Sequence, residues 1–300
     1  MTSDKPDSDF EATTRALETA GLTWTSVDWK DQHAPWTSCR AAMVRSTWDY
    51  AENRDSFLAS MHRASIFCDL VNPFDVLAWN TDKTYLRDLA DSGCAVVPTL
   101  WVDPNVCNSR SALTSALPRE WTDIVVKPTV GAGGSGAMRT RSAEKASAYA
   151  VSGGPVLVQP YLNSVDTEGE FSLVYLDGKF SHAVRRGPYL RPETLRGSLL
   201  VPETADSEWD VAPCNAEEEC REVAEQALRT VPVDNPLLYA RVDLLRDDEG
   251  RMRIAELELT EPFLFLEYAE GAADRLASAL RDRLTAEPGP LGRTSQRSSR

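Results

Sequence analysis

The sequence has 300 residues, of which 42% are hydrophobic, and this length is enough for two or three compact units. The 32 basic residues against 46 acidic ones give a net charge of −14, which repels a phosphate backbone, so we expect no nucleic-acid partner. The apolar runs at 94–102 and 263–269 are much shorter than the ~20 residues that cross a bilayer, and residues 1–9 lack the apolar core of a signal peptide, so we expect no membrane contact and a cytoplasmic location.

Helical and strand signals alternate over the first 80 residues, which is typical of an open α/β domain. Phe10 and Leu17 suggest one helix and Phe57 to Met61 another, and the runs at 41–44 and 66–73 predict short buried strands. Such a domain normally begins with a strand, whereas this chain passes from polar residues directly into a helix. Either the first strand is missing or the strand order differs.

Strands and helices continue to alternate through the middle of the chain. Residues 80–90 read as a helix start capped by Asn80, Thr81 and Asp82. Further expected strands lie at 95–100, 123–127 and 155–162, with helices near 110–117 and at 142–151.

The last third of the chain predicts two hairpins and two helices. Alternating residues on either side of Asp177-Gly178 predict the first hairpin. Asn215 with Glu218 suggests a capping box that opens a helix to Val231. We then expect strands at 237–245 and 251–259, a leucine-rich final helix, and a disordered tail at 287–300.

A glycine-rich loop, GAGGSG at 131–136, follows the strand that ends in Lys127. It matches G-x-G-x-x-G, but a dinucleotide site needs a helix after the loop and an acidic residue about 20 positions on, and this sequence has neither. Ala137 and Met138 stand where a Walker A loop has Lys and Ser or Thr. What remains is a strand–loop–strand hairpin whose N–H groups can cover phosphates beside Lys127, or an ordinary flexible hairpin with a surface lysine.

Three carboxylates and an arginine gather on residues 239–262. If residues 247–250 form a four-residue turn, Arg246 pairs with Arg251, so that Asp243 faces Ile254 and Arg241 faces Glu256. Because side chains alternate along a strand, the three carboxylates, Asp243, Glu256 and Glu258, then share one face with Arg241. Such oxygen ligands suit Mg²⁺, although a solvated acidic face in an acidic protein is the alternative.

The order of these motifs, NTDK, VVKP with GAGGSG, VLVQPYL with EGEFSLVYLDGKF, and ARVDLL with IAELELTEP, resembles the ATP-grasp ligases from about residue 80 to 268. RSTWDY and ELELTEP look closest to the bacterial group that contains the ligase closing the D-cycloserine ring. Glutathione synthetase and D-alanine–D-alanine ligase are more distant relatives. The resemblance implies an α/β protein with the α+β ATP-grasp fold, and a nucleotide held between its last two domains.

The resemblance also assigns roles to residues. It implies that Lys83 and Lys127 bind the nucleotide phosphates under the loop, that Glu170 holds the ribose, and that Arg241 faces the transferred phosphoryl group. Many relatives have asparagine where Glu258 stands. The loop residues in this scheme are Gly133, Gly134, Ser135 and Gly136; the adenine hinge is Gln159, Pro160, Tyr161 and Leu162; the metal ligands are Asp243, Glu256 and Glu258.

The implied activity is ATP-dependent ligation of a carboxylate to an amine through an acyl phosphate. ATP and Mg²⁺ are the expected cofactors, with two ions and with Mn²⁺ as an alternative metal. Arg185 or Arg186 is expected to bind the substrate carboxylate or the acyl phosphate. The partners are a small carboxylate and an amine, in the same molecule or in two, and the sequence leaves a homo-oligomer open.

The expected domains are a pre-ATP-grasp domain at 1–82, a central lid domain at 83–160, a C-terminal domain with the metal site at 161–286 and the tail at 287–300. Two other functions stay open at this point. One is a nucleotide-binding protein that has the fold without turnover, and the other is a phosphotransferase that releases a phosphorylated product.

Overall fold

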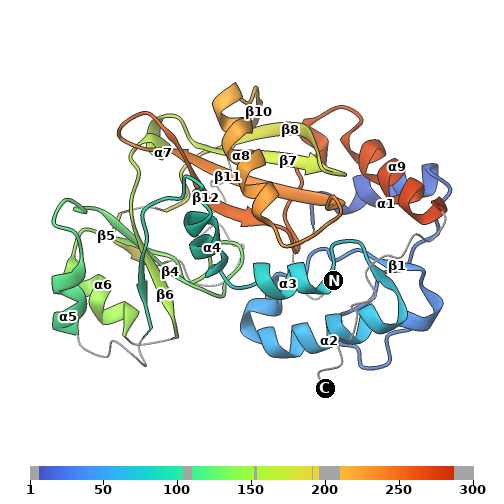
Figure 1. Cartoon of the computed structure of the whole chain (residues 1–300), viewed down its shortest axis with the longest axis horizontal. Coiled ribbons are helices and arrows are strands. Elements are labelled where there is room, and N and C mark those ends of the chain that lie inside the picture. Colours follow the sequence, from blue (N-terminus) through green and yellow to red (C-terminus); the bar gives the residue numbers. More distant parts are fainter. Residues whose placement is uncertain (1–6, 104–109, 152–153, 191, 196–209, 287–300) are drawn as a thin grey trace, which may run out of the picture.

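The computed structural model describes residues 7–103, 110–151, 154–190, 192–195 and 210–286. Two five-stranded sheets dominate it, with an N-terminal helical region beside the larger one (Figure 1). No helix in these ranges is both long enough and apolar enough to span a bilayer. The predicted disordered tail at 287–300 lies outside the described residues.

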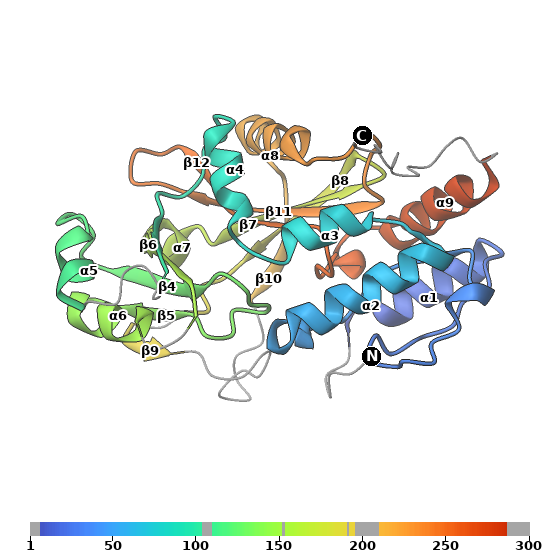
Figure 2. The same cartoon turned by 60° about the horizontal axis from the view of Figure 1, so that its bottom comes forward.

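The larger sheet is antiparallel and has the strand order β10-β8-β7-β11-β12. Leucines, valines and alanines that alternate along its strands pack on one face against α4 and α8. Part of the other face packs against α1 and α9 (Figure 2), which leaves the rest of that face for polar side chains. The bounds are β7 Glu170–Leu176, β8 Lys179–Arg186, β10 Val211–Cys214, β11 Tyr239–Arg246, β12 Met252–Glu258, α1 Phe10–Thr19, α4 Tyr85–Asp91, α8 Glu218–Thr230 and α9 Ala272–Thr285.

The smaller sheet is also antiparallel and has the order β3-β6-β4-β5-β9. Helices α5 and α6 cover its outer face (Figure 1). The predicted strand–glycine loop–strand unit is confirmed, because β4 and β5 pair on either side of the loop. The bounds are β3 Leu100–Val102, β4 Ile124–Pro128, β5 Met138–Thr140, β6 Val156–Pro160, β9 Thr194–Leu195, α5 Arg110–Ala116 and α6 Ala143–Ala150.

The N-terminal region contains a small parallel pair, β1 Ala41–Ala42 and β2 Asp69–Leu70. Both strands are shorter than predicted. Helix α2 extends through Phe67, so the first two residues of the expected strand 66–73 are helical, and Ile66 and Phe67 are exposed. The apolar side chains of these two residues therefore do not mark a buried strand. The remaining elements are α2 Arg54–Phe67, α3 Phe74–Asn80, α7 Ser164–Thr167, η1 Trp36–Ser38, η2 Trp48–Glu52 and η3 Leu266–Tyr268.

Two local predictions were wrong, and a third is confirmed only in part. Asp82 accepts the N–H of Thr84 just before α4, as the predicted helix start requires. Asn80 instead ends α3, and its side chain hydrogen-bonds the backbone of Leu257 and Leu259. Helix α8 begins at Glu218 with Glu217 as its N-cap, so Asn215 forms no capping box. The strand expected at 95–100 starts only at Leu100. Residues 95–97, which precede this strand, instead form backbone hydrogen bonds with Ile254 at the edge of the larger sheet.

The predicted pairing of β11 with β12 is also wrong, although the predicted common face is found. Arg246 lies opposite Met252, one residue beyond the prediction, because the turn is longer: Asp247 accepts hydrogen bonds from the N–H groups of Glu249 and Arg251. A second extra residue, Ala255, forms a β-bulge between the pairs Leu244–Ile254 and Asp243–Glu256.

The bulge determines which way the acidic side chains face. A shift of one residue alone would turn Glu256 and Glu258 toward the α8 side of the sheet. The bulge adds a second residue, so Glu256 lies opposite Asp243, and Glu258 lies opposite Arg241. Ile254 stays in the core under α8, and the carboxylates two and four residues later emerge on the opposite face.

Candidate active site

A cleft lies between the two sheets, with about 970 Å³ of unfilled space that includes the part open to solvent. The glycine loop and β4 form its roof, and β7, β8, β11 and β12 form its floor. Residues of η2 close one end. Its lining combines charged side chains, aromatic rings and the backbone of the glycine loop, which is typical of a site for a polar small molecule.

The floor of the cleft brings together the three predicted carboxylates. Each of Asp243, Glu256 and Glu258 offers one oxygen, and these oxygens lie within 4.8 Å of one another. Asp243 is buried, whereas Glu256 and Glu258 are partly exposed to the cleft. An all-oxygen set of this size fits a hard divalent cation such as Mg²⁺.

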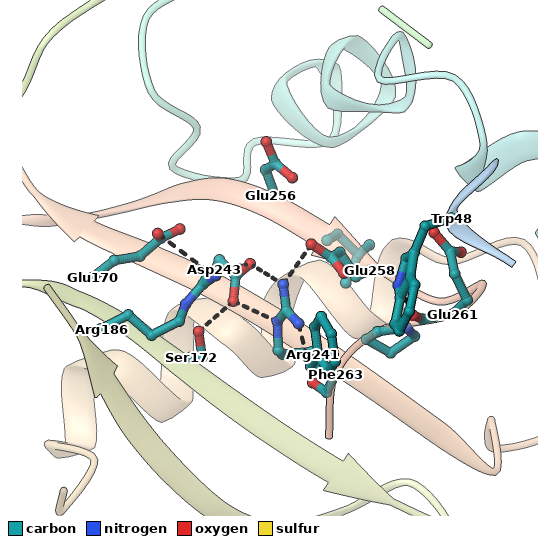
Figure 3. A network of polar contacts seen from close by, with 12 residues as sticks. Trp48, Glu170, Ser172, Arg186, Arg241, Asp243, Glu256, Glu258, Glu261 and Phe263 are labelled. Carbon is teal, nitrogen blue, oxygen red and sulfur yellow. Dashed lines mark hydrogen bonds and ion pairs between the residues drawn. The ribbon is translucent and has the colours of Figure 1, made fainter. Parts of the chain in front are cut away.

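Asp243 is the centre of a buried polar network (Figure 3). Arg241 donates two hydrogen bonds to its carboxylate, at 2.9 and 2.8 Å, and also bonds Glu258. Arg186 approaches the same carboxylate at 2.9 Å, and Ser172 donates a 2.6 Å hydrogen bond to it. Three side chains thus hold Asp243, whereas Glu256 is paired with Lys127 and Glu258 with Arg241.

The network changes the acidity of each carboxyl group. Burial alone would raise the pKa of Asp243, but Arg186 and Arg241 outweigh it and lower the pKa to about 2. Burial also opposes ionisation of Glu256, yet Lys83 and Lys127 hold its pKa below the usual value. For Glu258, burial exceeds the opposing effect of Arg241, and its pKa is raised. Asp243 and Glu256 are thus ionised at neutral pH.

The roof of the cleft supplies cations and backbone N–H groups. Lys127 ends β4, and its Nζ lies 3.3 Å from Glu256 Oε1. Lys83 Nζ donates a 2.7 Å hydrogen bond to the carbonyl of Gly131, which ties it to the base of the loop. Gly133, Gly134 and Gly136 have positive φ angles, the backbone region that favours glycine. The loop conformation therefore depends on these glycines.

A second cavity adjoins the first, with about 510 Å³ of unfilled space that includes its open part, and its lining is largely apolar. The predicted hinge residues Gln159, Pro160, Tyr161 and Leu162 all line it, together with Val97, Val125 and Leu245. Lys127, Glu170 and Tyr189 line both cavities. A ligand with a flat ring in the second cavity could therefore extend a polar group into the first cavity, toward its lysines and carboxylates.

Glu170 lies at the junction of the two cavities. Its carboxylate is paired with Arg186 at 3.1 Å. Burial raises its pKa to about 7, against the effect of Arg186. Arg186 thus links Glu170 to Asp243, and the two cavities share one charge network.

The structure separates the two arginines predicted for the substrate carboxylate. They are consecutive on β8, so they point to opposite faces of the sheet. Arg186 lines the cleft, whereas Arg185 is exposed and does not line it.

Sequence reasoning missed several residues of the cleft. Trp48, Tyr50, Glu261 and Phe263 line one end, and Ser172 supports Asp243 from below. Trp48 and Phe263 stack with ring centroids 4.7 Å apart, and Trp48 Nε1 donates to the backbone oxygen of Glu261. The motifs RSTWDY and ELELTEP contained three of them, but only the fold brings residue 48 next to residue 261.

The charges of the cleft lining favour a divalent metal. Among the described residues, four cationic side chains and five carboxyl groups line the cleft. A triphosphate would add several negative charges, which these cations cannot balance. The cations are Lys83, Lys127, Arg186 and Arg241, and the carboxylates are Glu170, Asp243, Glu256, Glu258 and Glu261.

Known proteins share this architecture. Residues 1–72 match the family model of the N-terminal domain of D-cycloserine synthetase DcsG. The cycloserine biosynthesis protein DcsG of Streptomyces lavendulae is 37% identical over 290 residues, which cover 93% of this chain and 94% of that protein. A crystal structure of D-cycloserine synthetase DcsG has a TM-score of 0.83 at 35% identity, with 93% of this chain and 95% of that chain covered.

A more distant solved structure has the same fold. The ATP-grasp ligase PsnB in complex with a minimal precursor has a TM-score of 0.60 at 19% identity, covering 93% of this chain and 96% of that chain.

Proposed function

The chain belongs to the DcsG family of ATP-grasp ligases, and from this membership we propose that it closes a ring by joining a carboxylate to a nitrogen of the same small molecule. It is an ATP-dependent carbon–nitrogen ligase. The ring closure, the substrate and the roles of individual residues are the proposal.

One observation carries it. Lys127 of the smaller sheet reaches Glu256 of the larger one, so phosphate-binding cations and acidic side chains meet at a single point between the sheets. Arg241 and Arg186 lie beside that point, on Asp243. Groups placed in this way balance charge on a phosphoryl group in transfer, and no protein nucleophile is needed.

The reaction has two steps. A substrate carboxylate oxygen attacks the γ-phosphorus of ATP, the bond to the β–γ bridging oxygen breaks, and ADP leaves. The substrate nitrogen then attacks the carbonyl carbon of the acyl phosphate, loses its proton to solvent and expels phosphate. The chain contributes position and charge: Lys83 and Lys127 hold the phosphates, and Arg241 and Arg186 face the transferred group.

The remaining proposed roles come from the family resemblance, and the lining of the two cavities supports them. In this proposal Gln159 to Leu162 lie against adenine, Glu170 holds the ribose, and the loop at 133–136 covers the phosphates. Asp243, Glu256 and Glu258, whose oxygens lie close together, would hold two Mg²⁺ ions, which would neutralise phosphate charge when bound. Arg186, not Arg185, is the candidate for the acyl phosphate, because it lines the cleft.

Ring closure is proposed from the relatives, which are named for D-cycloserine. In that ring the carbonyl carbon is bonded to the ring nitrogen, so forming this bond closes the ring. A substrate of this kind carries its carboxylate and its nucleophilic nitrogen in one molecule. Holding both ends in one cleft favours the intramolecular step through orientation.

The test measures ADP release with ATP, Mg²⁺ and a panel of amino-acid derivatives that carry an aminooxy or related nitrogen. We expect ADP in equal amount to a product lighter than the substrate by one water. Added hydroxylamine should divert part of the acyl phosphate to a hydroxamate. A phosphorylated product that accumulates would instead indicate a phosphotransferase, and no ADP with any carboxylate would indicate a binding protein.

A further inference from the structure

The end of the cleft formed by η2 contains a carboxylate that the proposed reaction does not use. Glu261 lines the cleft and is 7% exposed. Among the described residues, neither oxygen of its side chain has a hydrogen-bond or ion-pair partner. Figure 3 shows Glu261 beside Trp48, beyond Glu258 at the end of the row of charged side chains, with Phe263 on the other side of Trp48.

No cationic side chain in the described part of the chain is paired with Glu261. Lys83, Arg45 and Arg241 are close enough to lower its pKa, but each has another partner. Lys83 bonds the carbonyl of Gly131, and Arg241 bonds Asp243 and Glu258. Arg45 bonds the carbonyl of Pro262 and pairs with Asp9. A largely buried carboxylate without a partner is unfavourable in its ionised form, so a ligand that brings a positive charge would stabilise it.

The walls around Glu261 determine which cation fits. Trp48 and Tyr50 are 4% and 5% exposed, and Trp48 stacks on Phe263. Aromatic faces attract organic cations, whereas Mg²⁺ needs a shell of oxygen ligands. The candidate metal cluster contains Asp243, Glu256 and Glu258 and does not include Glu261. A primary ammonium group satisfies both the carboxylate and the rings.

We propose that Glu261, with Trp48 and Phe263, forms a subsite for the α-ammonium group of the substrate. The inference rests on the proposed function and names the residues that recognise the free α-amino group of its substrate. Glu258 and Glu261 line the same cleft, so a substrate whose carboxylate lies at the proposed metal site can direct its α-ammonium group to Glu261.

The subsite also orients the substrate. The α-nitrogen cannot attack the acyl phosphate of its own molecule, because that would close a strained three-membered ring. By holding the α-ammonium group, Glu261 directs the second nitrogen of the same molecule toward the acyl carbon, which favours ring closure through orientation.

A matched pair of ligands tests the subsite by binding alone. The probes are D-cycloserine and isoxazolidin-3-one, which is the same ring without the amino group, each titrated calorimetrically into the protein with Mg²⁺ and ADP. A charge-assisted hydrogen bond in a buried site is worth ~1.5–3 kcal/mol, so we expect roughly 10- to 100-fold tighter binding of D-cycloserine. Equal affinities for the two rings, or no binding of either, would overturn the subsite.

Two variants with the same change in charge locate the effect. Glu261→Gln should bring the two affinities within about threefold, whereas Glu267→Gln, at an exposed acid on η3, should keep the wild-type ratio. Both variants should bind ADP with Mg²⁺ as the wild type does. A more than tenfold loss of ADP affinity in Glu261→Gln would place Glu261 in the metal site and overturn the proposal.

The outcome is separate from that of the ligase test. If D-cycloserine is preferred but no substrate yields ADP, the subsite stands and the ring-closing function fails. If ADP is released equally from α-amino acids and from their deaminated analogues, the ligase stands and the subsite fails.

Discussion

Lys127 and Glu256 form an ion pair between the two sheets, with 3.3 Å between Nζ and Oε1. A nucleotide phosphate that binds Lys127 must compete with Glu256 for it, and a divalent ion bound by Glu256 removes that competition. We therefore expect Glu256→Gln to lower kcat by about 10²- to 10³-fold, the cost typical of losing one group that stabilises transferred charge.

The control for this variant is its fold. Both side chains of the pair are partly exposed, at 14% and 20%, so the melting temperature should change by only a few degrees. Glu249→Gln, which removes an exposed acid in the β11–β12 turn, should leave turnover unchanged. Normal turnover by Glu256→Gln would rule out its assignment as a metal ligand.

Glu258 stands where many ATP-grasp ligases have asparagine, and here it bonds Arg241. Glu258→Asn removes one negative charge but keeps an oxygen that can bind a cation. We expect turnover to survive and the Mg²⁺ concentration for half-maximal rate to rise several-fold, because a carboxylate attracts the ion more strongly than an amide. A titration of Mg²⁺ at saturating ATP measures this, and an unchanged Mg²⁺ dependence would mean that Glu258 binds no ion.

The fold could be predicted from the sequence where the pattern was local. The glycine loop between two strands and the β7–β8 hairpin at Asp177-Gly178 both follow from turn residues and alternation. The bulge at Ala255 could not be predicted, because alanine carries no bulge signal and the irregularity is held by segment 95–97, which is distant in the sequence. The extension of α2 through Ile66 and Phe67 could not be predicted from the local pattern either, because these apolar residues read as the start of a strand.

The candidate site shows the same division. Residues that share a strand or a loop, such as Asp243 and Arg241, were found from the alternation of side chains. Glu261 was not found, because its burial depends on Trp48, which is more than 200 residues earlier in the chain. Arg185 and Arg186 could not be told apart until the pairing of β8 fixed which of them faces the cleft.

Gly136 should tolerate substitution less well than Gly131 in the same loop. Its φ is +72°, and an added Cβ would meet Pro128 Cγ at 2.8 Å and Tyr149 Oη at 3.2 Å. At Gly131 the nearest atom would be 3.5 Å away, without a positive φ. We expect Gly136→Ala to weaken ATP binding about tenfold or more and Gly131→Ala much less, measured as the KM for ATP. Equal losses would show that the backbone conformation at Gly136 does not determine ATP affinity.

Arg186 and Arg185 form a natural pair for mutation. Arg186 joins Glu170 to Asp243, so Arg186→Gln should leave both acids without this partner and reduce kcat by at least about tenfold. Arg185 projects from the other face of β8, so Arg185→Gln should have a much smaller effect. Steady-state rates of both variants show which arginine acts in the cleft. A larger loss of kcat in Arg185→Gln would assign this role to Arg185 instead of Arg186. Circular dichroism of Arg186→Gln separates loss of rate from loss of fold.

Glu261 gives the empty protein a pH dependence whose sign can be derived. Burial, followed by the negative charge of Glu258, raises the pKa of Glu261 to about 8. A carboxyl group whose pKa is higher in the folded than in the unfolded state contributes stability that is fully present below its unfolded pKa. That contribution is lost as the pH rises through about 8.

The measurement compares the free energy of unfolding of the wild type with that of Glu261→Gln between pH 5 and 9, without nucleotide or metal. Glutamine stays neutral, so the stability of the wild type relative to the variant should fall across this range, by on the order of a few kcal/mol. Groups that do not interact with Glu261 titrate equally in both proteins, so the difference reports Glu261 together with the groups coupled to it, among them Glu258. A constant difference from pH 5 to 9 would mean that Glu261 is already ionised and paired in the empty cleft. A ligand that carries an ammonium group should reduce the pH dependence of the wild type, because ionised Glu261 then has a partner.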